Sequence, residues 1–322
     1  MNQFTLPELY CPFPSQLNKH VDVLEDYALK WVLRFNLLRN ESVARSFSKS
    51  QFFLLTARCY PYCQLEELKI INDWVSWMMT FDDLCDEEDI GKNPDLLKIY
   101  YTRFVEILKG SEFTGSDIPH AYALRDIRER LLQIGSVKWY DYFVRSIEDF
   151  FNGCVQEAAN KSQVNVPDVD TYIMMRRLTG GMEHFLDLID FCYHLTVPNL
   201  LREHDCLKQL RLMANNMASW CNDIFSASKE IAIGDVNNLI IVLVYKEELP
   251  LEKAIQRAVQ MHDQEVRDMI ALEASIPAFG EEIDVQVTNY ISGLHNWIRG
   301  NLDWHCKSRR YHDIEKLQLV KS

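Results

Sequence analysis

Glycine and proline are scarce in this chain of 322 residues, which contains 11 Gly and 10 Pro. Together they make up 21 of the 322 residues, well below the roughly 12% of average usage. These two residue types supply most tight turns, so few turns are expected. A β-sandwich or barrel needs a turn about every ten residues. The composition therefore disfavours these folds and favours long helices.

The sequence also lacks the segments that would direct it out of the cytoplasm. Its nine Cys residues are irregularly spaced and include no C-x-x-C pair, which favours a reducing compartment over a disulfide-stapled protein. The start of the chain, MNQFTLPELYCPFP, has neither the basic nor the long apolar part of a signal peptide. The apolar run from Leu239 to Tyr245 is too short to span a bilayer. We therefore expect a soluble, cytoplasmic protein.

Positive charge is in deficit. The chain has 34 Lys and Arg against 47 Asp and Glu, a formal net charge of −13. Such a charge repels nucleic acid and anionic lipid, so neither a nucleic acid nor a membrane is expected as a partner. An anionic small substrate would need a local basic site or bridging metal ions.

Apolar residues make up 48% of the chain, and they recur with a helical period along most of it. Helices are predicted for residues 18–38, 61–81, 94–109, 120–135, 137–160, 168–178, 182–195, 199–218, 219–233, 239–244, 250–272 and 280–306. The breaks between them are short, and none resembles an interdomain linker. The sequence therefore predicts an all-α helical bundle, with residues 1–322 forming one domain.

Six carboxylates crowd the C-terminal end of the helix that precedes them, in the string FDDLCDEED. The helix dipole disfavours negative charge there, by about 0.3–1 kcal/mol for each group. Asp82 and Asp86 belong to a D-D-x-x-D pattern that places both on one helical stripe. A bound cation would explain the cluster, because carboxylate oxygens are preferred ligands of Mg²⁺. A solvated acidic turn is the alternative interpretation.

A second stripe of oxygen donors follows in the string SWCNDIFSASKEIAI. Asn222, Ser226 and Glu230 are spaced by four residues, so they lie along one side of a helix. Asn and Ser are weak helix formers, and their placement in a helix interior needs a reason. An amide, a hydroxyl and a carboxylate oxygen together suit a hard cation. The stripe predicts a second metal site, with a merely polar helix face as the alternative.

These two motifs, 140 residues apart, resemble those of the class I terpene synthases, specifically the single-domain microbial type. Two further positions agree with that family. Arg176, in YIMMRRLTGG, precedes Asn222 by 46 residues, where the family carries a diphosphate-sensing arginine. Arg310 and Tyr311 end the string WHCKSRRY and match the family's Arg–Tyr pair.

The resemblance implies a helical bundle around an apolar cavity, with the two motifs facing each other across its mouth. It implies a cluster of three Mg²⁺ ions, with Mn²⁺ tolerated, that holds the diphosphate of an isoprenoid substrate. The implied metal ligands are Asp82, Asp86, Asn222, Ser226 and Glu230. The implied diphosphate ligands are Arg176, Lys229, Arg310 and Tyr311, with Arg177 as a neighbour. Gly180, after Thr179, would contribute a backbone carbonyl at a helix break.

The resemblance also implies a lining that excludes water and stabilises carbocations with aromatic faces. Trp304, six residues before Arg310, is the main candidate. Phe53, Trp74, Trp77 and Phe151 are further candidates, although core packing is the simpler interpretation of each. Relatives often carry an aromatic residue three or four positions before the first Asp, whereas this chain has Met78 and Met79 there. Methionine is flexible and polarisable, so the product cannot be inferred by analogy.

We therefore expect a lyase that ionises an isoprenyl diphosphate, with farnesyl diphosphate and a sesquiterpene product as the specific expectation. A chain-elongating prenyl transferase shares this chemistry but normally has two aspartate-rich motifs. A helical binding protein without catalysis is a third possibility, and it would not respond to Mg²⁺. Either a monomer or a homodimer is compatible with the sequence.

Overall fold

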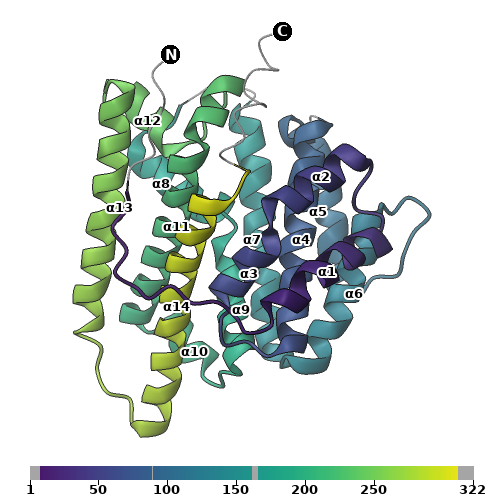
Figure 1. The fold of residues 1–322 in the computed structure, drawn as a ribbon, viewed down its shortest axis with the longest axis horizontal. Helices are drawn as coiled ribbons and strands as arrows, with labels where there is room; N and C mark the ends of the chain where they lie inside the picture. The colour runs from purple at the N-terminus through teal and green to yellow at the C-terminus, as the bar shows by residue number, and fades with distance from the viewer. Residues whose placement is uncertain (1–7, 89, 162–165, 311–322) are drawn as a thin grey trace.

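The computed structural model of the chain describes residues 8–88, 90–161 and 166–310. All regular elements in these ranges are helical, as the sequence predicts. They are α1 (Val21–Arg34), α2 (Glu41–Ser50), α3 (Phe52–Cys59), α4 (Leu65–Glu87), the 3₁₀ turn η1 (Ile90–Lys92), α5 (Pro94–Leu108), α6 (Pro119–Ile134), α7 (Val137–Lys161), α8 (Val169–Thr179), α9 (Met182–Tyr193), α10 (Pro198–Glu203), α11 (Asp205–Ile233), α12 (Leu239–Lys246), α13 (Leu251–Glu273) and α14 (Glu281–Lys307). Figure 1 shows them packed as a bundle.

Local sequence signals set several of the helix starts. Asn93 precedes α5, and its side chain accepts a hydrogen bond from the backbone N–H of Leu96 at 3.1 Å. Pro94 occupies the first turn, where its missing N–H costs nothing. Asp168 caps α8 in the same way through the N–H of Thr171, at 2.9 Å. These side chains satisfy backbone donors that have no partner inside the helix.

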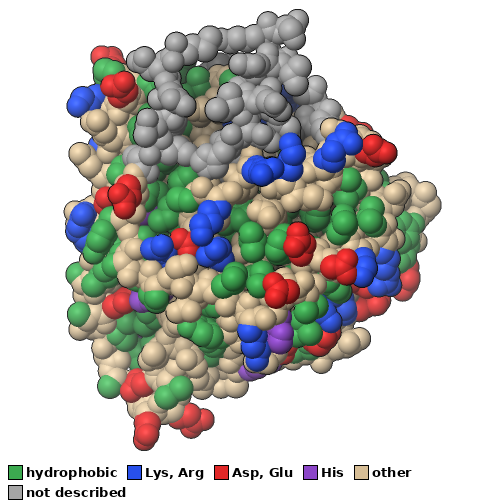
Figure 2. Space-filling view, viewed as in Figure 1, with side chains coloured by type: hydrophobic (Ala, Val, Ile, Leu, Met, Phe, Trp, Pro, Cys, Tyr) green, Lys and Arg blue, Asp and Glu red, His purple; other side chains and the backbone are tan. Residues whose placement is uncertain are grey.

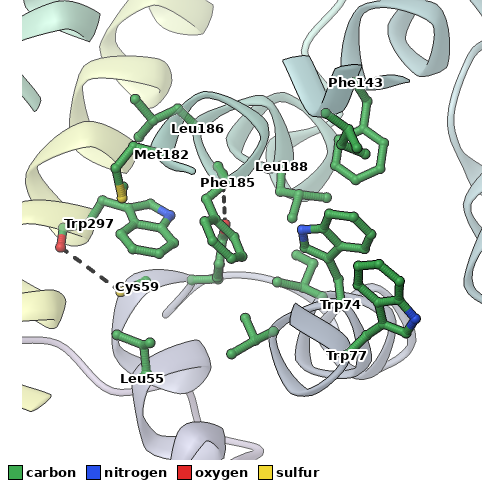
Figure 3. Close-up of a cluster of buried hydrophobic side chains, with 14 of the residues drawn as sticks. Leu55, Cys59, Trp74, Trp77, Phe143, Met182, Phe185, Leu186, Leu188 and Trp297 are labelled. Carbon is green, nitrogen blue, oxygen red and sulfur yellow. Dashed lines mark hydrogen bonds between the residues drawn. The ribbon is translucent and has the colours of Figure 1, made fainter. Parts of the chain in front are cut away.

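Aromatic side chains fill the main core between α4, α7, α9 and α14, part of which is shown in Figure 3. Trp74 is fully buried, and its ring stacks on Trp77 with a centroid distance of 5.3 Å. Phe143 of α7 packs against Trp74 edge-on at 5.2 Å. On the other side of this cluster, Phe185 of α9 contacts Trp297 of α14 at 5.3 Å. These ring contacts join α4 to α7 and α9 to α14.

The backbones of α3 and α14 approach unusually closely at Gly300. A Cβ atom at this position would lie 2.8 Å from the carbonyl carbon of Arg58 and 2.9 Å from the amide nitrogen of Cys59. Glycine is the residue that permits such an approach. Nearby, the thiol of Cys59 lies 3.9 Å from the carbonyl oxygen of Trp297, the contact drawn as a dashed line in Figure 3.

A second buried cluster surrounds α11. Trp220 and Ile224 of α11 pack with Leu243 of α12 and with Ala254 and Ala258 of α13. Both α13 and α14 contact α11, and Figure 1 shows α13 along the left edge of the molecule. The hydrophobic stripe predicted for residues 250–272 is therefore the face with which α13 covers α11.

Two features of the fold differ from the sequence-based expectation. Residues 41–59 form α2 and α3, which the hydrophobic pattern does not predict because α2 contains four serines, weak helix formers. Its start is fixed by the side chain of Asn40, which accepts a hydrogen bond from the N–H of Val43 at 3.0 Å.

The second difference concerns residues 199–233. The two helices expected at 199–218 and 219–233 are instead the short α10 and one continuous α11. Residues 213–221 of α11 are all buried, so packing maintains the helix through its Asn and Ser residues.

Charged side chains of both signs alternate with apolar ones on the face shown in Figure 2. Among the described residues, none of the helices combines the length and the hydropathy needed to cross a membrane.

Candidate functional site

The aspartate-rich motif lies at the C-terminal end of α4, where the sequence places it. The helix continues to Glu87, and its last turn contains no basic residue. Asp82 lies in the turn before the last one of α4, and its side chain is 63% exposed. Asp83 is less accessible, at 24%. The side chain of Asp86 lies outside the part of the structure that is described.

Arg310 reaches this motif from the far end of the chain. Its Nη1 lies 3.1 Å from Oδ1 of Asp83 and its Nη2 lies 3.5 Å from Oδ2 of Asp82. The guanidinium group also lies over the ring of Phe52, 5.5 Å from its centroid. The predicted diphosphate-binding arginine is thus next to the first motif, 228 residues away in sequence. Tyr311, its predicted partner, lies outside the described residues.

The second motif lies on α11, with Asn222, Ser226 and Glu230 on successive turns. Arg176 of α8 donates from Nη2 to Oδ1 of Asn222 at 2.9 Å. The same guanidinium binds the buried carboxylate of Asp223, with its Nε 3.0 Å from Oδ1. The arginine predicted to sense the diphosphate is therefore beside the second motif, as the family resemblance implies.

An ion pair with Asp223 holds Arg176 in place. The carboxylate is buried and accepts a hydrogen bond from the hydroxyl of Tyr172 at 2.6 Å and another from the N–H of Leu239 at 3.3 Å. Burial raises the pKa of the Asp223 carboxyl, and the positive charge of Arg176 opposes that effect. The ion pair holds the guanidinium in one place while its outer edge contacts Asn222.

Burial raises the pKa of Glu230 to about 7. The charge of Asp223 raises this pKa further, whereas a hydrogen bond from Asn238 lowers it. A carboxylate with a raised pKa gains from a nearby cation, because the cation stabilises its charged form. Ser226, one turn earlier on the helix, is buried.

Contacts between side chains connect the two motifs. Nε2 of His305 lies 3.3 Å from Nδ2 of Asn222. The ring of His305 packs edge-on against Trp304 at 4.9 Å, and Trp304 contacts Phe52 at 5.7 Å. Phe52 in turn lies beneath Arg310. α14 and α3 thus bridge the predicted metal-binding ends of α11 and α4.

The orientation of Asn222 follows from its neighbours. Arg176 can only donate, so the amide oxygen faces it. Nδ1 of His305 lies 2.8 Å from the backbone carbonyl oxygen of Asn301 and must carry the proton there. Nε2 of the neutral ring then accepts from Nδ2 of Asn222. His305 therefore keeps the amide oxygen, the atom suited to a metal, on the side of Arg176.

The helix break expected after Arg176 is observed. α8 ends at Thr179 and α9 begins at Met182, with Gly181 in a left-handed conformation at φ 68°. A Cβ atom on Gly180 would lie 2.5 Å from Oγ of Ser219 and 2.8 Å from the carbonyl oxygen of Arg176. Glycine suits this position because Ser219 of α11 lies so close to the backbone of residue 180 that a side chain would collide with it.

The remaining predicted residues fall in different surroundings. Lys229 is exposed, and Arg177 donates to Oδ1 of Asn216 at 2.8 Å, one turn and a half from Asn222. Met78 and Met79 are partly buried against the main core. Trp304 is buried, and its indole N–H donates to the carbonyl oxygen of Ser50 at 3.0 Å. Of the other aromatic candidates, Trp74, Trp77 and Phe151 are core residues, and Phe53 is partly buried.

The donor set fits a metal that is shared with a substrate. Within the described part of the chain, no three His, Cys, Asp or Glu side chains gather into a cluster that could hold a metal alone. In the second motif Glu230 is the only carboxylate of the three side chains, and Asn222 and Ser226 add neutral oxygens. Mg²⁺ suits such a site, because it usually binds one or two carboxylates together with water and substrate phosphates.

Four residues of this site were not found by sequence reasoning: Tyr172, Asp223, Asn238 and His305. Tyr172 and Asp223 meet across 51 residues, and His305 meets Asn222 across 83, so no spacing rule identifies these contacts. Asn238 has the clearest local signal, since it directly precedes the apolar run at Leu239 and is a favoured helix N-cap residue. His305 occupies an ordinary position on α14.

Comparisons with known proteins agree with this geometry. The family model described as terpene synthase family 2, C-terminal metal binding, matches residues 73–268. The chain is 52% identical to germacrene A synthase of Nostoc punctiforme, an alignment that covers 100% of this chain and 99% of the relative. It is 32% identical to the (+)-T-muurolol synthase of Roseiflexus castenholzii, over 99% of this chain and 97% of that one.

Solved structures of the same architecture are similar in fold. Germacradien-4-ol synthase from Streptomyces citricolor superposes with a TM-score of 0.83 at 23% identity, over 93% of this chain and 98% of that chain. An α-eudesmol synthase superposes with a TM-score of 0.84 at 21% identity, over 94% and 99% of the two chains. The fold, the family model and the full-length relatives lead to one conclusion: this chain belongs to the metal-binding terpene synthases of family 2.

Proposed function

We propose that the protein ionises farnesyl diphosphate, releases the diphosphate and cyclises the resulting carbocation to a sesquiterpene hydrocarbon or alcohol. The observation that carries this proposal is the placement of the two arginines. Arg176 contacts Asn222 of one metal motif, and Arg310 contacts Asp82 and Asp83 of the other. Two cationic forks beside two sets of oxygen donors suit a metal-bound diphosphate.

Farnesyl diphosphate is the substrate that the relatives favour. The (+)-T-muurolol synthase is named as an enzyme that cyclises (2E,6E)-farnesyl diphosphate. The similarity to germacrene A synthase over the full length of both chains makes germacrene A the first product to test.

Asp82, Asp86, Asn222, Ser226 and Glu230 would hold a cluster of three Mg²⁺ ions, with Mn²⁺ accepted in their place. When bound, these ions neutralise the charge of the diphosphate and make it a better leaving group. Asp82 is accessible for this purpose. The raised pKa of Glu230 indicates a carboxylate that gains stability from a cation at this place.

The chain's own hydrogen-bond donors, three cations and one phenol, bind and orient the diphosphate. Arg176, Arg310, Lys229 and Tyr311 donate hydrogen bonds to its oxygens. These bonds strengthen as negative charge develops on the leaving group, and such differential binding lowers the barrier to C–O cleavage. The backbone carbonyl of Gly180, at the helix break, turns its negative end toward the developing allylic cation.

The apolar part of the site protects the carbocation from water. Trp304, Met78 and Met79 line this space in the proposal, and the aromatic face stabilises positive charge. Trp304 is suited to a fixed position because its N–H is bonded to the carbonyl oxygen of Ser50. We further propose that residues 1–322 form one synthase domain that works in the cytoplasm as a monomer or homodimer, without nucleic acid or membrane partners.

A product screen tests the function. The purified protein is incubated with ten-, fifteen- and twenty-carbon allylic diphosphates in Mg²⁺, and the extracts are analysed by gas chromatography with mass spectrometry. A sesquiterpene formed from farnesyl diphosphate alone, and lost with EDTA, is the expected result. Products that appear only with added isopentenyl diphosphate would indicate a chain-elongating transferase. No turnover and no response to Mg²⁺ would indicate a binding protein.

A further inference from the structure

Asn238 lies outside both metal motifs, in the segment between α11 and α12, and its side chain is fully buried. Its Nδ2 lies 2.8 Å from Oε2 of Glu230 and 2.7 Å from the carbonyl oxygen of Asp223. The same nitrogen lies 3.4 Å from Oγ of Ser226. One amide group therefore contacts two of the three side chains of the second metal motif.

The oxygen of the Asn238 amide caps a helix. Oδ1 of Asn238 accepts a hydrogen bond from the backbone N–H of Ile240 at 2.8 Å and thereby caps α12. The next residue, Leu239, donates its N–H to Oδ2 of Asp223 at 3.3 Å. The N-terminus of α12 is thus attached to α11 at two neighbouring points.

The donor of these hydrogen bonds, the side-chain amide of Asn238, carries no charge. An amide N–H₂ can only donate, so the carboxylate of Glu230 and the hydroxyl of Ser226 are its acceptors. A neutral donor fixes the orientation of a carboxylate and leaves its negative charge available to a cation. A lysine or arginine in the same place would neutralise that charge and compete with the metal. Hydrogen-bond partners of this kind tune metal ligands in many sites.

We propose that Asn238 is a positioning residue for the second metal motif: it holds Glu230 and Ser226 in their metal-binding orientation and couples that orientation to the start of α12. This inference rests on the proposed function, because it assumes that the Asn222–Ser226–Glu230 stripe binds metal. Asn238 touches neither substrate nor metal in this role. It acts through the two ligands.

The substitution Asn238→Asp separates the two tasks of the residue. Aspartate is also a good N-cap residue and still accepts from the N–H of Ile240. It has no donor for Glu230 or Ser226. Asn238→Ser is the second variant, since serine also caps helices but has a shorter side chain and introduces no charge. Asn40→Asp is the matched control: Asn40 caps α2 in a similar way, and its hydrogen-bond acceptor role lies outside α11.

The measurements are the Mg²⁺ concentration that gives half-maximal turnover, and the rise in melting temperature on adding Mg²⁺ with inorganic diphosphate. For both Asn238 variants we expect the half-saturating Mg²⁺ concentration to rise by about 10- to 100-fold. The melting temperature without ligands should fall for both variants, and further for Asn238→Asp, which buries a second carboxylate beside Glu230. Measured against each variant's own ligand-free value, the rise with Mg²⁺ and diphosphate should shrink. The Asn40→Asp protein should match the parent in both measurements.

A folded Asn238→Ser or Asn238→Asp protein with the parent's half-saturating Mg²⁺ concentration would overturn the inference, even if its maximal rate were lower. If Asn238→Asp does not fold, Asn238→Ser decides the question alone. A parent protein that shows no response to Mg²⁺ and diphosphate would instead refute the proposed function itself. The two failures are therefore distinguishable.

Discussion

Asp223→Asn tests the buried ion pair that holds Arg176 at the second motif. The substitution keeps the size of the side chain and removes its charge. The carboxylate has four donors: Nε and Nη2 of Arg176, the hydroxyl of Tyr172 and the N–H of Leu239. An amide offers one oxygen and turns its own N–H₂ toward the remaining donors. At least one hydrogen bond is lost, and the guanidinium loses its nearest counter-charge.

The magnitude follows from the burial of the pair. The side chain of Asp223 is 1% exposed and that of Arg176 is 17% exposed. Removing one partner of a buried ion pair typically costs about 3–5 kcal/mol. The amide of the variant keeps one acceptor, so we expect a loss of about 3 kcal/mol in the free energy of unfolding. Asp26→Asn, which removes an exposed pair with Lys30, should cost less than about 0.5 kcal/mol.

Equilibrium unfolding in urea, without metal or substrate, measures both values. The double variant Arg176→Met, Asp223→Asn adds a second check, because losses at two residues in direct contact should not add. The loss in the free energy of unfolding should be smaller, by at least about 1 kcal/mol, than the sum of the losses in the two single variants. An Asp223→Asn protein within about 0.5 kcal/mol of its parent would refute the assignment of a buried, functional ion pair.

Three further predictions concern the site. Gly180→Ala places a methyl group 2.5 Å from Oγ of Ser219, so it should cost about 1–3 kcal/mol by urea unfolding, and adding Ser219→Ala should recover part of that loss. The raised pKa of Glu230, about 7 in the metal-free protein, means that its contribution to stability is lost as pH rises from about 4.5 through 7. The same shift predicts that half-saturating Mg²⁺ rises as pH falls from 8 to 6, and Glu230→Gln should flatten both dependences. Asp82→Ala and Asn222→Ala should abolish sesquiterpene formation with unchanged far-ultraviolet circular dichroism; full turnover in either variant would contradict the metal assignment.

The parts of the site that the sequence predicts are those governed by local periodicity. Asp82 and Asp86 are predicted as metal ligands because the helix dipole disfavours carboxylates at a helix C-terminus. The structure places their D-D-x-x-D motif at the end of α4. Asn222, Ser226 and Glu230 follow from a four-residue spacing, and they share α11. The family model and the full-length relatives confirm the family, and the structure confirms the all-α fold, whereas the roles of the individual residues stay predictions.

Long-range partners could not be predicted, because no local rule relates their positions. His305 and Asn222 are 83 residues apart, and Tyr172 and Asp223 are 51 apart. Helix α2 was missed for a related reason: its serine-rich sequence is a weak helix former, and its stability comes from the cap at Asn40 and from packing. Tertiary contacts decide such positions, and a single sequence does not reveal them.

The contact at Gly300 limits how this scaffold can be re-engineered. Helices α3 and α14 touch backbone to backbone there, and the same two helices carry Phe52 and Trp304 to the region between the motifs. Any larger residue at position 300 would wedge these helices apart and displace both rings together. Mutant libraries that aim at new terpene skeletons should therefore vary the side chains facing the substrate and leave the spacing of this helix pair as it is.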